Sequence, residues 1–179
     1  MSRIFVKGIV AGVLTTAFLA VAPAARAEVP VFGVGVGIGE VGTIGLNARL
    51  RPFNHFQIEA GIGGYVYLIS NGHDTDSGIV PAYSTEALFM LSDRQSRNQH
   101  GIGLLLGYEE IRGTLVGLCY RYERYFKDKR SGFHAELGVL YGPDAEENAI
   151  EYFDKNSDIP IDDDDYSFIP VTLKIGFHF

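Results

Sequence analysis

From residue 32 onward, apolar side chains occupy every second position of the chain over long stretches. The pattern is clearest at the C-terminal end, where apolar residues alternate with other residues from Val171 to Phe179. A period of two is that of a β-strand, because successive side chains of a strand point to opposite faces. Eight segments show it: 32–39, 43–51, 56–68, 83–91, 101–109, 116–123, 133–142 and 169–179. The sequence therefore predicts an all-β protein of eight strands, without a helix of useful length after Glu28.

The connections between these segments predict hairpins, so that each strand pairs with the next in antiparallel order. The odd-numbered connections are 40–42, 70–78, 110–113 and 142–166, and the even-numbered ones are 52–54, 92–99 and 127–131. No second domain or linker interrupts them. The last odd connection holds ten acidic residues against Lys155 alone, which gives it a net charge of −9. We expect an eight-stranded up-and-down barrel whose last loop is long and acidic.

The first 27 residues have the features of a secretory signal peptide. Arg3 and Lys7 precede an apolar run of about 15 residues, and Ala25-Arg26-Ala27 has the A-x-A form of a cleavage site. A transmembrane helix usually needs ~20 apolar residues, so this run is short for a membrane anchor. We expect cleavage after residue 27, leaving residues 28–179 as the barrel domain. Loss of three cationic residues takes the net charge from −7 to −10.

Eight exported strands suit two kinds of barrel, which differ in the face that is buried. A soluble, lipocalin-like barrel turns its aliphatic face inward, whereas a transmembrane barrel turns it toward lipid. The chain has 22 Gly in 179 residues, about 12% against a usual ~7%. These glycines share the polar face of the strands with long charged residues. Glycine has no packing role on a surface in water, but it leaves room in the narrow lumen of an eight-stranded barrel.

Aromatic residues on the apolar face gather near the strand ends, as in the interfacial girdles of membrane barrels. They are Phe32, Phe56, Tyr83, Phe89, Tyr108, Tyr120, Tyr122, Phe133, Tyr141, Phe177 and Phe179. Ten residues at a rise near 3.3 Å and a tilt of ~45° span about 23 Å, close to the ~25 Å apolar band of such barrels. The transmembrane barrel is therefore the favoured interpretation.

The C-terminal residues Val171, Leu173, Ile175, Phe177 and Phe179 resemble the assembly signal of bacterial outer-membrane barrels. The segment differs from that signal at Lys174, where the signal usually has glycine. With the signal peptide and eight strands, the mature chain resembles the small outer-membrane barrels of the OmpA and OmpX type. The resemblance is one of architecture. It implies periplasmic termini, short periplasmic turns, surface-exposed odd loops, insertion by the barrel-assembly machinery, and contact with outer-membrane lipid and lipopolysaccharide.

Charged residues of both signs lie on the predicted lumen face, where each needs a partner, because an unpaired buried charge costs several kcal/mol. They are Arg49, Glu59, Glu86, Arg121, Glu123, Glu136 and Lys174. We expect an ion-pair network that fills the lumen. Such a network is either a stabilising plug or, if its pairs rearrange, a narrow ion path. Cys119 lies on the same face and is expected to be filler, and His134 a hydrogen-bonded lumen residue.

The acidic loop is either a solvated loop tip or a site for Ca²⁺ or Mg²⁺, since hard cations take several oxygen ligands. The candidate ligands are Asp158, Asp162, Asp163, Asp164 and Asp165. Such ions would bridge the loop to anionic lipopolysaccharide. The spacing matches no EF-hand.

Composition and motifs narrow the function. The negative charge argues against nucleic acid, and the single cysteine excludes an intramolecular disulfide and a zinc site made of cysteines. We expect no cofactor and a monomeric, non-enzymatic porin-like protein of the Gram-negative envelope, which supports its integrity or interacts through its loops. The alternatives are a lipid A-modifying hydrolase on the same scaffold and a narrow ion channel. No His has a Ser two residues on, so a hydrolase triad would come from distant strands.

Overall fold

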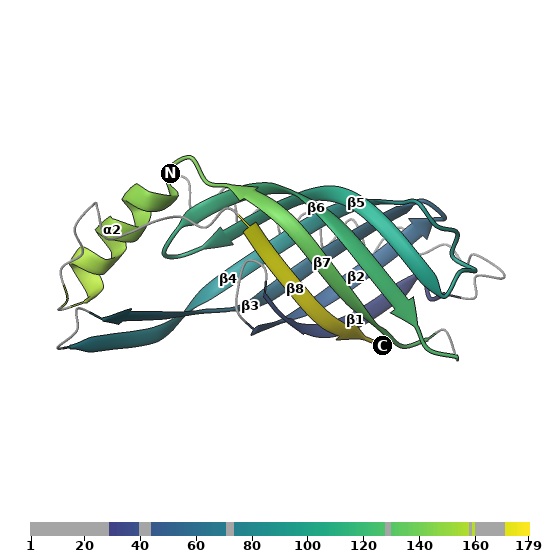
Figure 1. Ribbon diagram of the computed structural model, residues 1–179, viewed down its shortest axis with the longest axis horizontal. Coiled ribbons are helices and arrows are strands. Elements are labelled where there is room, and N and C mark those ends of the chain that lie inside the picture. The colour runs from purple at the N-terminus through teal and green to yellow at the C-terminus, as the bar shows by residue number, and fades with distance from the viewer. Residues whose placement is uncertain (1–28, 40–43, 71–73, 128–129, 158, 160–170) are drawn as a thin grey trace.

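The strands close into one antiparallel barrel in which every strand pairs with its sequence neighbours (Figure 1). The computed structural model describes residues 29–39, 44–70, 74–127, 130–157, 159 and 171–179. The predicted signal peptide (1–27) lies outside these residues. The strands are β1 (Phe32–Ile38), β2 (Ile44–Phe53), β3 (Phe56–Ser70), β4 (Thr75–Met90), β5 (Asn98–Glu109), β6 (Gly113–Tyr125), β7 (Gly132–Tyr141) and β8 (Val171–His178). The predicted eight-stranded up-and-down barrel is confirmed.

Strands β1 and β8 close the barrel in four register pairs, from Gly35 opposite His178 to Ile38 opposite Ile175. Val34 and the C-terminal Phe179 extend this seam, since each donates its backbone N–H to the carbonyl oxygen of the other, at 3.2 and 2.8 Å. The last residue of the chain is therefore part of the closure. The C-terminus and the short turns lie at one end of the barrel, which we call the C-terminal end.

Burial alternates along the strands as the period of two predicts. In β8 the residues from Val171 to His178 are exposed and buried in strict alternation. The exposed set on the other strands is also aliphatic and aromatic, for example Leu46, Leu104, Leu118 and Val139. The opposite set holds the buried charged residues and most of the glycines, which are buried or half-buried. The barrel thus carries its apolar face outward and its polar face inward.

Strands β3 and β4 continue beyond their neighbours as a two-stranded arm (Figure 1). Strand β2 pairs with β3 only as far as Gly64, and β5 pairs with β4 only from Ala82, whereas β3 and β4 pair up to Ser70 and Thr75. The sequence prediction of a loop over 70–78 and of a strand beginning at 83 was wrong here. The two strands pair with each other along the arm, and Tyr65, Tyr67 and Ile69 pack against a buried apolar cluster at its base.

A helix, α2 (Ala145–Asn156), lies within the segment that was predicted to be an acidic loop, so the expectation of no helix was wrong. It packs over the barrel end that carries the arm, which we call the α2 end (Figure 1). Ala145, Ala149 and Phe153 are buried, one helical turn apart, while its acidic residues remain exposed. Lys155 donates to Glu151 one turn earlier, and this hydrogen bond lowers the pKa of the Glu151 carboxyl.

Among the described residues, no helix is both long enough and apolar enough to cross a membrane.

Candidate functional site

The lumen is lined unevenly, because the strands contribute side chains of different size. Strand β1 turns only Gly33, Gly35 and Gly37 inward, and β2 and β3 add Gly45, Gly61 and Gly63. Some of these glycines adjoin a long side chain, as the narrow lumen requires. A Cβ at Gly33 would lie 2.8 Å from the Nε of Arg49, and Gly37 and Gly45 line one pocket with Lys174.

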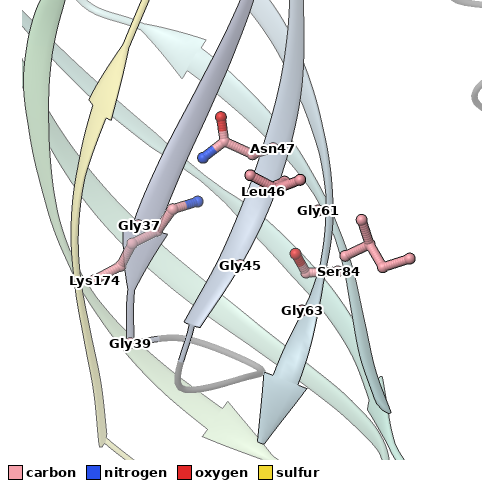
Figure 2. A pocket seen from close by; sticks show the side chains of 10 residues that line it. Gly37, Gly39, Gly45, Leu46, Asn47, Gly61, Gly63, Ser84 and Lys174 are labelled. Atoms are coloured by element: carbon pink, nitrogen blue, oxygen red, sulfur yellow. The ribbon is translucent and has the colours of Figure 1, made fainter.

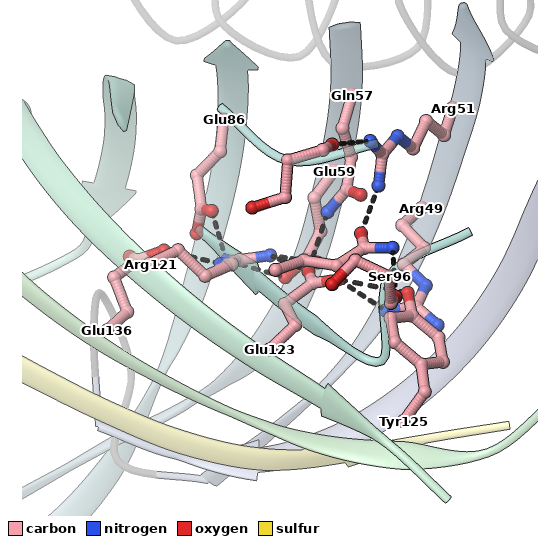
Figure 3. A network of polar contacts seen from close by, with 12 residues as sticks. Arg49, Arg51, Gln57, Glu59, Glu86, Ser96, Arg121, Glu123, Tyr125 and Glu136 are labelled. Carbon is pink, nitrogen blue, oxygen red and sulfur yellow. Dashed lines mark hydrogen bonds and ion pairs between the residues drawn. The ribbon is translucent and has the colours of Figure 1, made fainter. Parts of the chain in front are cut away.

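Arg121 on β6 is the centre of the polar network (Figure 3). Its guanidinium donates to Glu136 at 2.7 Å, to Glu59 at 2.6 and 3.3 Å, and also to Glu86. Glu123 lies 3.7 Å from the same guanidinium. The carboxylates come from β3, β4, β6 and β7, so one side chain connects four strands. The planar, multivalent donor geometry of arginine suits this position.

Lys174 completes this central layer from β8. Its Nζ donates to Glu86 at 3.1 Å and also to Glu59. Lysine at this position, where the outer-membrane assembly signal usually has glycine, thus has a role in the lumen. The layer, defined as Glu59, Glu86, Arg121, Glu136 and Lys174, holds three carboxylates and two cations.

A second layer lies on the C-terminal side of the first and centres on Glu123. This carboxylate accepts hydrogen bonds from Gln57 at 2.9 Å and Tyr125 at 2.9 Å, and it lies 3.4 Å from Arg49. The Arg49 guanidinium also lies over the Tyr125 ring, 5.3 Å from its centroid. The structure therefore brings together all seven charged residues named from the sequence, in two adjoining layers.

At the C-terminal end of the lumen, buried side chains donate hydrogen bonds to residues in or next to the turns. Arg51 donates to Gln99 and to the carbonyl oxygens of Asn54 and Ser92, the last at 2.8 Å. Arg94 donates to the carbonyl of Val29 at 2.9 Å. Arg51, Gln57, Gln99 and Tyr125 were not named as candidates from the sequence. For Arg51 and Gln57 the available signal was their position on the polar face of the alternation, whereas Gln99 and Tyr125 lie outside the segments in which alternation was recognised.

Two histidines stack against each other beside the second layer. The rings of His134 and His178 are 5.9 Å apart and nearly parallel, at 7°. Both side chains are buried, and none of their four ring nitrogens has a hydrogen-bond partner within the described part of the chain. His134 therefore lies in the lumen as predicted, but without the predicted hydrogen bonds. His178 was missed, although it shares that face of β8.

Apolar side chains fill the lumen toward the α2 end. Ala82, Leu105, Leu115, Leu140 and Ala145 form one buried cluster. A second cluster, of Val80, Ile111, Ala149 and Phe153, joins α2 to the base of the arm, with Tyr65 and Tyr67 packed against it. We call the two clusters together the apolar plug. It lies on the side of β4 to β7, opposite the glycine-rich wall.

The glycine-rich wall leaves a small pocket that is partly open to solvent (Figure 2). Its lining includes Gly37, Gly45, Gly61 and Gly63, and its polar groups come from Asn47, Ser84 and Lys174. The pocket thus reaches the lysine that holds the central layer. The proposed cation ligands Asp158, Asp162, Asp163, Asp164 and Asp165 lie outside the described residues.

Comparisons with known proteins place the fold but not the family. No family model matches the chain, and no curated protein matches its sequence. A search of solved structures finds the crystal structure of CarO from Acinetobacter baumannii, with a TM-score of 0.51 and 13% identity. The match covers 86% of this chain and 99% of that one. The chain thus has the architecture of CarO, as the resemblance to small eight-stranded barrels predicted. At 13% identity the match supports the fold and nothing about function.

Proposed function

We propose that the protein is a non-enzymatic barrel of the bacterial outer membrane, exported with a signal peptide that is cleaved after residue 27. The main support for this proposal is that the outward face of the strands is apolar. Aliphatic side chains such as Leu46, Leu104 and Leu118 are at least 60% exposed, and they form a band around the barrel. In water this band would be a large apolar surface of the kind that monomeric soluble proteins avoid. In a bilayer it faces lipid.

The aromatic residues support the same orientation. Tyr83 and Tyr108 are register partners near the α2 end, and Tyr141 lies at the corresponding end of β7. Phe53, Phe56, Phe89, Phe177 and Phe179 are exposed near the C-terminal end. Two rims of aromatic residues around an aliphatic band are the usual arrangement of transmembrane barrels. The α2 end then faces outward from the cell and the C-terminal end faces the periplasm.

The filled lumen supports a structural or adhesive function rather than transport. The central layer, the Glu123 layer and the apolar plug occupy successive levels of the barrel. The arm and α2 are then the parts available to lipopolysaccharide or to other surface molecules. Divalent cations at the acidic segment that follows α2 would strengthen contact with lipopolysaccharide, and the C-terminal strand would be recognised by the barrel-assembly machinery.

The test combines fractionation, gel mobility and conductance. We expect the protein in the outer-membrane fraction, without residues 1–27, and with a mobility on unheated gels that shifts after boiling. Planar bilayers containing it should show no ion conductance. Recovery of a soluble, detergent-independent protein would contradict the membrane assignment, and steady conductance of the wild type would contradict the filled lumen.

A narrow ion path is the second candidate, because the small pocket in the glycine-rich wall adjoins Lys174 of the central layer. Conductance that changes in Glu136→Ala would favour it, since this substitution removes one partner of Arg121 and leaves the strands intact. A hydrolase has weaker support. The ring nitrogens of His134 lack any partner in the described chain, so the described chain pairs no serine hydroxyl with it.

A further inference from the structure

Three potential metal ligands converge at the level where the central layer meets the apolar side of the lumen. Glu86 on β4, Cys119 on β6 and Glu136 on β7 each offer one ligand atom, and these atoms lie within 4.8 Å of one another. All three residues are buried. Around a tetrahedral Zn²⁺, ligand atoms at bond lengths of 2.0–2.3 Å are about 3.6 Å apart. The three side chains would therefore need to close by about 1 Å.

The charges of the central layer favour an additional cation. Glu59, Glu86 and Glu136 carry three negative charges, whereas Arg121 and Lys174 carry two positive ones, which leaves a net charge of −1. Glu123 and Arg49 balance each other in the next layer. Arg51 donates to Gln99 and to backbone carbonyls at the C-terminal end rather than to these carboxylates. A buried charge without compensation is costly, and either a shared proton or a bound cation would compensate this one.

Glu136 supplies an independent indication of a ligand. Only 1% of its surface is exposed, and its Oε2 accepts from Arg121, but its Oε1 has no hydrogen-bond partner among the described residues. Cys119 lies diagonal to it across β6 and β7, because the register pairs Glu136 with Arg121 and Cys119 with Gly138. Leu88 and Met90 pack against the cysteine. An unpartnered carboxylate oxygen therefore lies near a thiol, between the charged central layer and the apolar side chains of Leu88 and Met90.

We propose that Glu86, Cys119 and Glu136 bind one Zn²⁺ ion in the lumen. One cysteine cannot form a zinc site made of cysteines, but one thiolate and two carboxylates are ordinary zinc ligands. The thiolate favours a borderline-soft ion over Ca²⁺ or Mg²⁺. Binding releases the thiol proton to solvent, so the ion adds two positive charges, the thiolate adds one negative charge, and the layer becomes neutral. The site is independent of the proposed envelope function.

The pocket lies beside this site, toward the α2 end. Lys174 lines the pocket and donates to Glu86 at 3.1 Å, so a single side chain separates the pocket from the first ligand. Asn47 also lines the pocket, is only 8% exposed, and has an Oδ1 without a partner in the described structure. An ion that reaches Glu86 from this side would displace Lys174 from that carboxylate.

The test uses the folded full-length mature protein in detergent micelles, titrated with Co²⁺ under anaerobic conditions and then with Zn²⁺. Cys119 is the chain's only cysteine, so a thiolate-to-cobalt charge-transfer band can arise from this residue alone. We expect one equivalent of Co²⁺ to produce the band and Zn²⁺ to abolish it. Cys119→Ser should eliminate the band, and Glu136→Gln should weaken binding by about tenfold or more.

The matched control is His55→Ala, which removes an exposed histidine that lies 3.8 Å from Asp93 at a turn. It should leave the band and the stoichiometry unchanged, because His55 is remote from the lumen layers. Metal binding that Cys119→Ser leaves intact, or that His55→Ala abolishes, would overturn the proposal. So would the absence of a band at millimolar Co²⁺ in wild-type protein that is folded by its gel mobility. That result would mean that the layer is neutralised by a shared proton only.

Discussion

Arg121 is the residue on which the stability of the lumen depends most. Its guanidinium contacts carboxylates from four strands, and its side chain is fully buried. In Arg121→Met a side chain of similar length replaces the charge, so that Glu59, Glu86 and Glu136 face one another with Lys174 alone. Removal of one partner from a buried ion pair costs about 3–5 kcal/mol. We expect a loss of that size in the free energy of unfolding, measured by urea titration in lipid vesicles.

Lys155→Met is the control for this substitution. Lys155 also donates to a glutamate, Glu151, but both side chains are more than half exposed on α2. Pairs of this kind on a helix surface contribute about 0.3–0.5 kcal/mol. Equal effects of the two substitutions would show that the lumen network does not carry the stability attributed to it.

Glycines of the lumen differ in what a methyl group would meet. A Cβ at Gly117 would lie 2.5 Å from the carbonyl oxygen of Val139, which belongs to the neighbouring strand and cannot turn away. A Cβ at Gly61 would lie 2.5 Å from the Oγ of Ser84, which can rotate. We therefore expect Gly117→Ala to lower the free energy of unfolding by about 1–3 kcal/mol, the usual cost of overpacking, and Gly61→Ala by less. The same urea titration compares them, and the reverse order would contradict the explanation.

At the scale of elements, the strands could be predicted and α2 could not. The alternation extends over whole strands, whereas α2 buries only Ala145, Ala149 and Phe153. These three residues are four positions apart and two of them are alanine, so the apolar stripe of the helix is narrow. Among the acidic residues of this segment, the sequence pattern therefore did not indicate a helix. The side chain of the N-cap residue, Asp144, makes no capping hydrogen bond. The helix is held by the barrel beneath it, and that contact is invisible in the sequence.

The arm was missed for a related reason. The residues from Ser70 to Gly78 include several turn-formers, which read as a loop. In the structure Thr75–Val80 forms a strand because it pairs with Tyr65–Ser70, whose own alternation was recognised only to Leu68. Pairing with an existing strand outweighs weak local preference. The boundary of an element thus depends on its partner as well as on its residues.

Phe153 is expected to hold α2 on the α2 end of the barrel. Its ring is buried and lies edge-on to Tyr67 of the arm, with centroids 5.4 Å apart. Phe153→Ala removes the largest apolar contact of the helix, while the strands keep their pairing. We expect hydrogen exchange in 145–156 to increase at least tenfold, and exchange in β5 to β7 to remain unchanged. Asp154→Ala, at the adjacent exposed position, should change neither. Faster exchange throughout the barrel would show that α2 is part of the global cooperative unit.

At the scale of the whole molecule, topology follows from the sequence but the partners across the lumen do not. Strand number, antiparallel order and the face of each residue are set by alternation and by the lengths of the connections. Contacts across the lumen also depend on how the closed sheet is staggered. Arg49 shows this, because its register neighbour on β3 is Glu59, yet its ion pair is with Glu123, 74 positions away. The set of lumen charges was predictable, and their pairing was not.

The assignment of the outer face to lipid gives the last prediction. Leu118 is 66% exposed and lies between Leu104 and Val139 in register, within the aliphatic band. Thr114 is on the same face of the same strand, beside Tyr108 at the rim. An arginine near the bilayer midplane costs about 2–4 kcal/mol, and one near the interface about 0–1 kcal/mol. We expect Leu118→Arg to lower the free energy of unfolding in vesicles by the larger amount and Thr114→Arg by the smaller. If water covered this face, Leu118→Arg would cost no more than Thr114→Arg, and its solubility without detergent would improve.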